Sequence, residues 1–296
     1  MPERRLAVAF GSSFLGFPTH FGFLRGLIEA GWAPAAVAGC STGAVVAGLY
    51  AAGAGLEAME QLFTLPRLSR CFYQWQAPWR ALATFLGVPG YAGIFLGDRL
   101  GDLLRERVGD LRIEDCPAAS LHIAVANLGR HRVEMRSRGP LVETILASCA
   151  MPGVMAPRRI GGELLWDGAL GSSVPVEPYL DDTAVTHLAT HSILFENQLR
   201  ARRQGPHNFA GALFAASQLK ADELLRWQLE LARRCGKTVQ AAETVTPCPR
   251  VGLPLTLPPP KPWPQHARDL MEAGAASART VIAGFTGGGE TPAASC

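Results

Sequence analysis

The chain has 296 residues, of which 48% are hydrophobic and 18% charged, and its formal net charge is +3 at pH 7. Such a length suits one large domain or two modest ones, and the composition excludes an intrinsically disordered chain. No Lys/Arg block is dense enough to indicate a nucleic-acid groove, whereas a weak attraction to anionic lipid surfaces is compatible with the charge.

The seven cysteines are scattered along the chain, without a CxxC pair or a Cys/His spacing typical of metal ligands. We therefore expect neither a zinc site nor a disulfide framework, and a reducing compartment fits best. No apolar run reaches about 18 residues, and the N-terminal run is typical of a strand, so we expect no transmembrane span and no signal peptide. These features predict a cytoplasmic protein or one that is peripheral at a membrane.

The first fifty residues alternate between strand and helix patterns. Residues 5–11 and 34–39 are short apolar runs closed by glycine, which is typical of buried strands. Residues 19–31 are predicted as a helix with Thr19 at its N-cap, and residues 42–53 as a helix rich in small side chains. Strand–helix–strand–helix over this length predicts an α/β fold with a parallel sheet.

Residues 66–96 have a different character, because aromatic side chains and arginines alternate there. One interpretation is a helical insertion that packs on the core. The other is a lid or a lipid-facing surface, where aromatic rings lie at an apolar–polar boundary and arginines meet phosphates. The residues concerned are Phe72, Tyr73, Trp75, Trp79, Phe85, Tyr91 and Phe95, with Arg67, Arg70 and Arg80.

The rest of the chain continues the mixture of helices and strands without an internal repeat or a clear linker. The predicted elements are an amphipathic helix at 97–109, strands at 120–128 and 131–137, a helix at 140–152, strands at 162–170 and 184–191, a helix at 221–235, a strand with a proline-rich connector at 249–264, and a helix at 265–285. We predict one domain over residues 1–285, with 66–96 as its insertion or lid, and a disordered tail at 286–296.

Ser41 is the first candidate functional residue. It lies in Gly39-Cys40-Ser41-Thr42-Gly43, between a predicted strand and a predicted helix. In that context Gly-x-Ser-x-Gly is typical of a nucleophile elbow, a sharp turn that presents the hydroxyl at a helix N-terminus. The alternative is an ordinary serine in a tight turn, since a serine nucleophile also needs a base and donors for the oxyanion.

Two kinds of base are available to Ser41. Hydrolases of the common α/β type use a late histidine, but none of the seven histidines lies in a distinctive late loop, and we expect each to be structural or at the surface: His20, His122, His131, His187, His191, His207 and His266. Asp167 ends an apolar strand and precedes Gly168, at the edge where open α/β sheets build their sites. In isolation an Asp-Gly pair indicates no more than a turn.

Taken together, three motifs resemble those of the patatin-like phospholipases, which are lipid acyl hydrolases with a Ser–Asp dyad and no histidine. The motifs occur in order as a glycine-rich loop at Gly11–Gly16, the elbow at Ser41, and Asp-Gly-Ala at Asp167. The likeness covers roughly residues 5–190. It implies a three-layer α/β/α fold with a mostly parallel central sheet.

The resemblance also implies roles for individual residues. Ser41 would attack an ester carbonyl, and Asp167 would accept its proton and then help to activate water against the acyl-enzyme. Backbone amides of the loop would bind the oxyanion, and neighbouring glycines would shape the turns. The loop residues are Gly11, Ser12, Ser13, Leu15 and Gly16, and the turn glycines are Gly39, Gly43 and Gly168. The scheme requires no metal and no cofactor.

The glycine-rich loop departs from the family pattern of Gly-Gly-Gly-x-Arg/Lys-Gly. Ser12 and Ser13 replace glycines, and Leu15 replaces the basic residue. We expect backbone strain if φ is positive at Ser12 or Ser13. The lost charge at Leu15 is expected to alter head-group preference or to lower activity.

Three functions are compatible with these motifs. The first is a hydrolase of phospholipids or lysophospholipids that takes its lipid substrate from a membrane surface. The second is an acyltransferase or thioesterase with the same dyad, because acceptor choice depends on pocket shape and water exclusion. The third is a pseudo-enzyme that binds lipid or a partner protein, against which the presence of both Ser41 and Asp167 counts.

Overall fold

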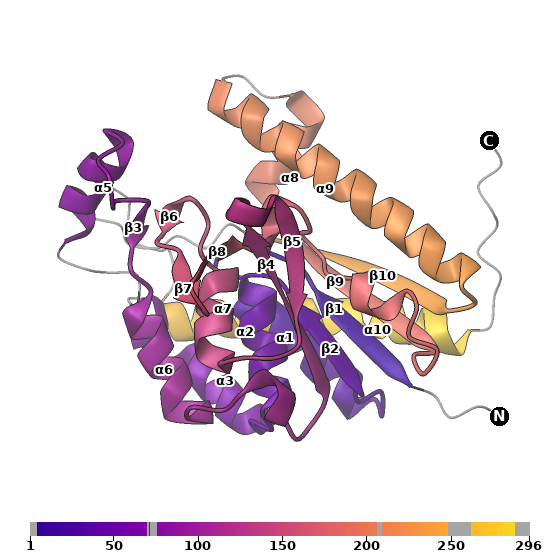
Figure 1. The fold of residues 1–296 in the computed structure, drawn as a ribbon. Helices are drawn as coiled ribbons and strands as arrows, with labels where there is room; N and C mark the ends of the chain where they lie inside the picture. Colours follow the sequence, from indigo (N-terminus) through magenta and orange to yellow (C-terminus); the bar gives the residue numbers. More distant parts are fainter. Residues whose placement is uncertain (1–4, 70, 72–75, 206–208, 248–261, 288–296) are drawn as a thin grey trace.

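The computed structural model describes residues 5–69, 71, 76–205, 209–247 and 262–287 of the chain. Its centre is an eight-stranded sheet. The strands are β1 (Leu6–Phe10), β2 (Ala36–Gly39), β4 (Ser120–Asn127), β5 (Arg132–Arg136), β7 (Arg158–Ile160), β8 (Glu163–Asp167), β9 (His187–Phe195) and β10 (Thr238–Thr246). Their order is β10-β9-β1-β2-β4-β8-β7, with β5 paired to β4 (Figure 1).

The five strands from β10 to β4 are parallel, whereas β8 and β5 run antiparallel to β4. In the parallel part, the chain passes from β1 to β2 and β4 in one direction, and later adds β9 and β10 on the other side of β1, so the strand order reverses at β1. In open α/β sheets the crevice for a ligand forms at such a point, beyond the carboxyl ends of the strands. The loops after β1 and β2 therefore lie where a site is expected.

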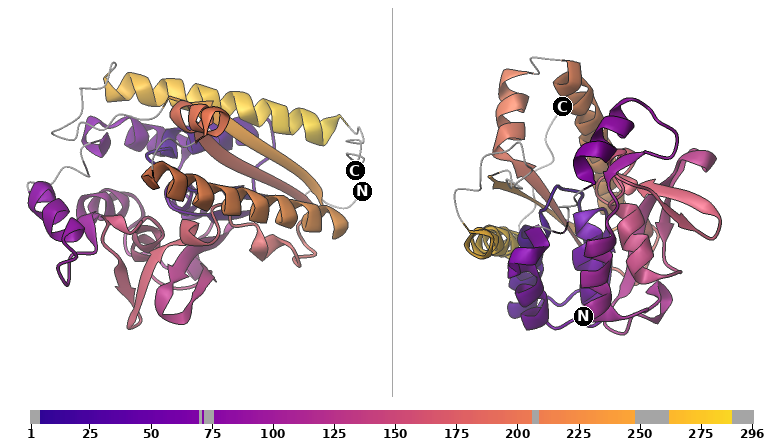
Figure 2. Two further views of the ribbon diagram at one scale, coloured as in Figure 1. Left: turned by 90° about the horizontal axis from the view of Figure 1, so that it is seen from above. Right: turned by 90° about the vertical axis from the view of Figure 1, so that its left-hand side faces the viewer.

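Helices cover both faces of this sheet, so the predicted three-layer α/β/α fold with a mostly parallel sheet is confirmed. One face carries α1 (Phe17–Glu29), α2 (Thr42–Ala51), α3 (Leu56–Thr64), α6 (Asp98–Val108), α7 (Leu141–Ser148) and α10 (Trp263–Thr286). The other face carries α9 (Phe209–Arg234). Seen from above, α10 and α9 lie on opposite sides of the β9–β10 pair (Figure 2).

Most elements expected from the sequence are present, with three corrections. The first helix begins at Phe17 with Gly16 at the N-cap, so Thr19 is a buried residue inside the helix rather than its cap. The helix expected at 221–235 already begins at Phe209. The last strand is β10 at 238–246, and most of the strand and connector expected at 249–264 lies outside the described residues, as does most of the tail expected at 286–296.

The segment 66–96 is partly helical, as the sequence predicts. It contains α4 (Pro66–Ser69), α5 (Ala77–Phe85) and β3 (Gly93–Phe95), and β3 pairs in parallel with β6 (Gly153–Met155) in a separate small sheet. Ala83 is the buried residue of α5, so this helix does not pack its large side chains on the core. Residues 70 and 72–75 of the segment lie outside the described ones, among them Arg70, Phe72, Tyr73 and Trp75.

One further helix, α8 (Glu196–Gln204), follows β9 directly and precedes α9. Within the described ranges, no helix combines the length and apolar character that crossing a membrane requires.

Candidate active site

Ser41 occupies a sharp turn between β2 and α2. Its backbone has φ 54° and ψ −121°, a conformation that side chains other than glycine rarely adopt. The flanking glycines are required by close packing. A Cβ at Gly39 would lie 2.4 Å from the Gly43 carbonyl oxygen, and one at Gly43 would lie 2.4 Å from the Phe10 carbonyl oxygen. The predicted strand–serine–helix elbow is therefore present, with its strain concentrated at the serine.

The turn is held from outside the motif by Ser148, at the end of α7. Its hydroxyl accepts a hydrogen bond from the Ser41 amide at 2.9 Å and donates one to the Ala124 carbonyl at 2.7 Å. Both serines are buried, with Ser41 7% exposed at the wall of a pocket. Ser148 was not singled out from the sequence, because its contact to the elbow spans more than a hundred residues along the chain.

Asp167 ends β8 and lies beneath the elbow, 1% exposed. Its Oδ1 accepts hydrogen bonds from the Ala169 amide at 2.9 Å and from the Cys40 thiol at 3.5 Å. A Cβ at Gly168 would lie 2.6 Å from the Ala124 carbonyl oxygen, so the chain turns here against β4 without room for a side chain. The structure thus brings Asp167 and Ser41 to one pocket wall, although 126 positions separate them in sequence.

Burial raises the pKa of Asp167 from its ordinary value to about 6. Hydrogen bonds from the Ala169 amide, the Ser41 hydroxyl and the Cys40 thiol act in the opposite direction and limit the rise. The carboxylate is therefore ionised at neutral pH, yet more basic than an exposed aspartate. Such a pKa near the working pH suits a group that accepts a proton from a hydroxyl and returns it.

Two thiols lie beside the same carboxylate. Burial raises the pKa of Cys40 and of Cys149 well above the ordinary range, and the negative charge of Asp167 adds to both increases. Both thiols are consequently protonated at neutral pH and are poor nucleophiles. Compared with these two thiols, the Ser41 hydroxyl at the strained turn is the better candidate nucleophile.

The glycine-rich loop Gly11–Gly16 connects β1 to α1 and is fastened to the neighbouring chain. The Gly11 amide donates to the His191 carbonyl at 2.9 Å, and the Ser12 amide donates to the Ser173 carbonyl at 2.8 Å. The Ser12 amide is thus committed within the protein. In this loop φ is positive at Leu15, at 55°, and not at Ser12 or Ser13. The backbone strain considered for the two serines therefore lies at Leu15 instead.

Ser13 ties the loop to the first turn of α2. Its hydroxyl lies 2.6 Å from the Thr42 hydroxyl, which also donates to the Ser13 carbonyl at 3.1 Å. A Cβ at Gly16 would lie 2.1 Å from the Ser13 hydroxyl oxygen, so this serine and the glycine fit together. Within the described ranges, the amides of Ser13, Leu15 and Thr42 donate no hydrogen bond, which leaves three donors at the pocket wall.

The pocket has a volume of about 700 Å³ and is open to solvent on one side. Its wall combines polar residues of the elbow and the glycine-rich loop with apolar side chains and, from α8, α9 and β10, several charged side chains. Its apolar lining includes Phe14, Leu15, Leu100, Met151, Val154, Leu170, Val174, Leu225 and Leu229, and its charged lining includes Arg202, Asp222, Arg226, Arg233 and Glu243. A ligand with one long apolar part suits such a groove.

No described histidine is among the pocket-lining residues, and His207 lies outside the described part of the chain. His20 and His191 form a fully buried pair with their Nδ1 atoms 2.8 Å apart, and His191 Nε2 lies 2.8 Å from the Thr244 hydroxyl. Burial lowers the pKa of both, that of His20 to about 3. These two histidines are structural, as the sequence predicts, and stay neutral.

Fold and site together define a class of protein: a three-layer α/β/α domain with a strand–serine–helix elbow above a buried carboxylate. The chain belongs to the patatin-like phospholipase family, whose family model matches residues 9–180. That match includes the glycine-rich loop, the elbow and the Asp-Gly turn.

Several known proteins are similar to this chain. The uncharacterised NTE family protein Mb1092c of Mycobacterium bovis is 34% identical over 175 residues, which cover 59% of this chain and 45% of that protein. Lysophospholipase nte1 of Emericella nidulans is 28% identical over 171 residues, which cover 58% of this chain and 10% of that protein. The chain thus spans less than half the length of the curated relatives it matches.

Among solved structures, VipD from Legionella pneumophila has a TM-score of 0.49 at 14% identity, over 95% of this chain and 67% of the other. The type III effector protein ExoU has a TM-score of 0.45 at 11% identity, over 94% of this chain and 53% of the other.

Proposed function

We propose that this protein is a lipid acyl hydrolase, which cleaves ester-linked acyl chains of phospholipids or lysophospholipids through Ser41 and Asp167. One observation carries the proposal. The strained elbow serine and a buried aspartate with a pKa of about 6 share the wall of an apolar pocket that no described histidine lines. A serine hydroxyl with an adjacent base and nearby amide donors is the arrangement that acyl transfer needs.

The reaction would begin when the Ser41 hydroxyl attacks the ester carbonyl and gives its proton to Asp167. The amides of Thr42, Ser13 and Leu15 are the proposed donors for the oxyanion, since they are not used elsewhere within the described ranges. Asp167 then returns the proton to the leaving alcohol. In the second half, Asp167 takes a proton from water, which attacks the acyl-enzyme and restores Ser41.

The substrate class follows from the pocket and the family. The apolar lining formed by Leu170, Val174, Leu225 and Leu229 suits an acyl chain, and Ser41 lines the same pocket. Such a lipid resides in a membrane or micelle, so we propose that the protein works at a membrane surface. The relative from Emericella nidulans carries the name lysophospholipase, which agrees with this substrate class.

A fluorophosphonate probe tests the nucleophile. Wild type should be labelled at Ser41, Ser41→Ala should not be labelled, and Asp167→Asn should label at least a hundredfold more slowly. Ser192→Ala is the control, because Ser192 also lines the pocket but lies on β9, and it should label like wild type. Absence of labelling at Ser41 in folded wild type would contradict the proposal and favour a lipid- or protein-binding pseudo-enzyme.

Release of fatty acid from phospholipid and lysophospholipid vesicles tests the reaction itself. The same assay with an added alcohol or thiol separates a hydrolase from an acyltransferase, because a transferase forms the new ester or thioester in preference to free acid. A thioester substrate examines thioesterase activity. Free fatty acid as the main product from the oxygen esters supports the hydrolase. A dominant transfer product would assign an acyltransferase instead, and preferred hydrolysis of the thioester would assign a thioesterase.

A further inference from the structure

Helix α5 presents its large apolar side chains to solvent. Trp79, Phe85 and Leu86 are 68%, 85% and 71% exposed, and Leu82 and Val88 are exposed as well. Trp79, Leu82 and Leu86 follow the helical spacing of one face, so the outward face of the helix is apolar. Exposed apolar clusters of this kind mark interaction sites rather than ordinary surface.

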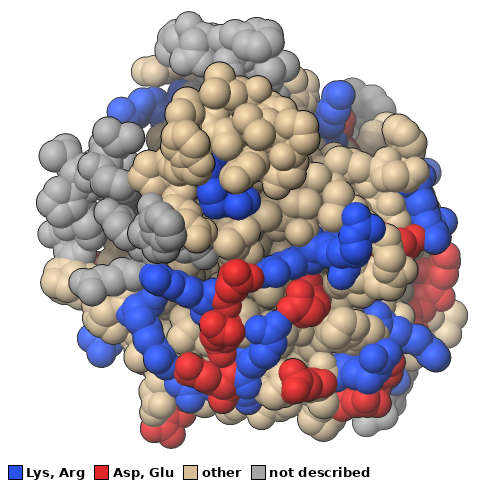
Figure 3. Space-filling view, turned by 60° about the vertical axis from the view of Figure 1, so that its left-hand side comes forward, with Lys and Arg blue, Asp and Glu red and all other residues tan. Residues whose placement is uncertain are grey.

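The lobe formed by residues 77–96 carries almost no charge. No Asp, Glu, Lys or Arg occurs between residues 81 and 97. The one charged side chain of α5, Arg80, turns inward: its Nε donates to the Ile94 carbonyl at 3.0 Å and its Nη2 to the Gly93 carbonyl at 2.7 Å. Figure 3 shows a broad area with a single Lys or Arg group in the upper part of this side of the molecule, above a band of mixed charges.

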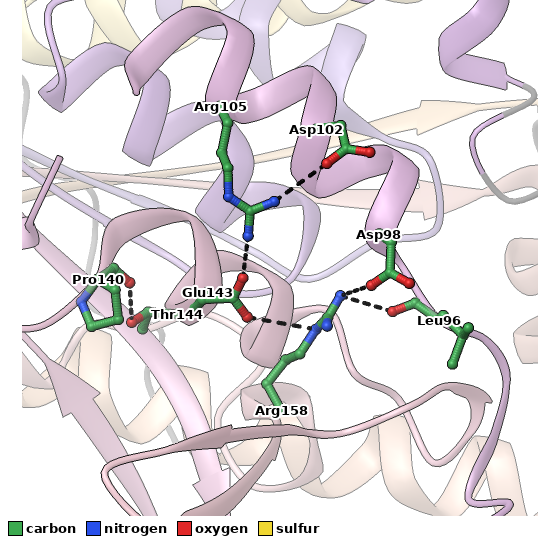
Figure 4. A network of polar contacts seen from close by, with 8 residues as sticks. All are labelled: Leu96, Asp98, Asp102, Arg105, Pro140, Glu143, Thr144 and Arg158. Carbon is green, nitrogen blue, oxygen red and sulfur yellow. Dashed lines mark hydrogen bonds and ion pairs between the residues drawn. The ribbon is translucent and has the colours of Figure 1, made fainter. Parts of the chain in front are cut away.

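The lobe is fastened to the wall of the pocket. β3 pairs with β6, and the residues around β6 that line the pocket include Met151, Val154 and Met155. At its base, Arg158 donates to the Leu96 carbonyl at 2.8 Å and bonds Asp98 at 3.0 Å, within a network that reaches Glu143 and Arg105 (Figure 4). The apolar surface therefore has a defined place beside the site.

A basic helix also contributes to the pocket wall. Gln198 and Arg202 of α8 line the pocket, and on the same helix Arg200 and Arg203 form no ion pair within the described ranges. In the end-on view of Figure 2, α5 and α8 both stand in the upper half of the molecule. The apolar lobe and helix α8 thus both contribute to the pocket wall, and α8 also carries two arginines without an ion pair in the described part of the chain.

From this arrangement we infer that α5 and its following turn are the surface that docks on a lipid bilayer, with Arg200 and Arg203 binding anionic head groups beside it. The inference deepens the proposed function and rests on it for the identity of the substrate. A bilayer suits the lobe because hydrocarbon accepts Trp, Phe and Leu without hydrogen-bond partners, whereas the head-group layer attracts Arg. Docking in this way would bring a lipid ester to the mouth that leads to Ser41.

Vesicle flotation of the full chain with Ser41→Ala tests the surface without consuming the lipid. Trp79→Ala with Phe85→Ala should reduce partitioning at least tenfold, on phosphatidylcholine vesicles and on vesicles containing phosphatidylglycerol. Arg200→Gln with Arg203→Gln should remove only the increase that phosphatidylglycerol produces. Unchanged partitioning of the Trp79/Phe85 variant, with a wild-type circular dichroism spectrum, would overturn the inference.

Trp227→Ala is the matched control. Trp227 is also 68% exposed, but it lies on the face of α9 opposite to the residues that line the pocket. It should leave partitioning unchanged, and a loss equal to that of the lobe variant would show nonspecific adsorption and overturn the inference. A wild-type dimer that the lobe substitutions convert to monomer, with vesicle binding unaffected, would assign the lobe to a second copy of the chain instead.

The docking surface and the proposed function fail in different ways. In the active protein, the lobe variant should hydrolyse a short-chain, water-soluble ester at the wild-type rate but vesicle lipid at least tenfold more slowly. Loss of both activities in the folded lobe variant would contradict a docking role. Lobe-dependent vesicle binding by a wild type that hydrolyses no ester would retain the docking surface and refute the proposed function.

Discussion

The two faces of the central sheet are built from the same strands but differ greatly in what they pack. In β1, the residues Leu6, Val8 and Phe10 point into the large core with α1 and α10, whereas Ala7 and Ala9 point to the opposite face, towards α9. In β2, Ala36 and Ala38 also belong to the α9 side. Because side chains alternate along a strand, the same strands present large apolar side chains to one face of the sheet and alanines to the other.

The thin side, which faces α9, contributes part of the pocket wall. Val174, Leu225 and Leu229 belong to the smaller cluster on the α9 side and also line the pocket. The strand alanines on this side are buried in the same small cluster and make its layer thin. We infer that packing on the face covered by α1 and α10 contributes most of the free energy of unfolding. The α9 side contributes less, and the elbow lowers the stability because its backbone is strained.

The largest expected difference comes from the same substitution on the two faces. Leu24→Ala, at a fully buried position of α1, should lower the free energy of unfolding by about 3–4 kcal/mol. Leu229→Ala, on α9 at the edge of the groove, should lower it by about 1–2 kcal/mol, because the lost contact faces existing open space. Urea unfolding of both variants measures the difference, and equal losses would contradict the division between the faces.

Asp167→Asn should have the opposite sign. The pKa of Asp167 is raised to about 6 in the folded protein, so the folded state binds its proton more tightly than the unfolded chain does. Stability therefore falls as the pH rises from about 4 to about 6, and the full cost is present above that range. Since an amide cannot ionise, the substitution should stabilise the protein by about 1–3 kcal/mol at pH 7.

Urea titrations at pH 4 and pH 7 provide the control for this prediction, because the gain should nearly vanish at pH 4, where Asp167 is protonated in both states. A gain of equal size at both values would trace the effect to packing instead. Destabilisation at pH 7 would show that the hydrogen bonds of the carboxylate outweigh its burial.

At Ser41 the cost is backbone strain. Ser41→Gly and Ser41→Ala both lack the hydroxyl, but glycine adopts a φ of 54° without a Cβ clash. We expect the glycine variant to be more stable than the alanine variant by about 1 kcal/mol. Thermal unfolding of the two inactive variants makes the comparison. An alanine variant as stable as the glycine variant would show that the turn is not strained.

The sequence predicted the parallel sheet, the elbow and the Asp-Gly turn, because those features depend on short local patterns. Thr19 shows where local reasoning failed: Pro18 allows the helix to start earlier, and the tertiary contact with α10 buries the residue. Ser148 and Leu15 show the second limit. A contact across the fold supports the elbow, and the one positive φ of the loop falls on a residue whose side chain suggested only a lost charge.

The same limit applies to Cys40, which the elbow pattern treats as a variable position. Its thiol donates to Asp167 Oδ1 at 3.5 Å and helps to keep the pKa of that carboxyl from rising further. Cys40→Ala should therefore raise the pKa of Asp167, and the acid limb of the pH–rate profile near 6 should move to higher pH. Activity at pH 8 should remain close to wild type, because the carboxyl is then ionised in both proteins.

Cys40→Ser separates this effect from a change in packing, since its hydroxyl restores a donor to the carboxylate. The serine variant should return the acid limb to its wild-type position or below it. An acid limb that stays in place in the alanine variant would show that the thiol only fills space. A shift that serine does not reverse would assign the effect to the cavity left beside Asp167. Either outcome would mean that Cys40 does not tune the pKa of Asp167. The energetic cost of the site would then arise from the burial of Asp167 and the backbone strain at Ser41.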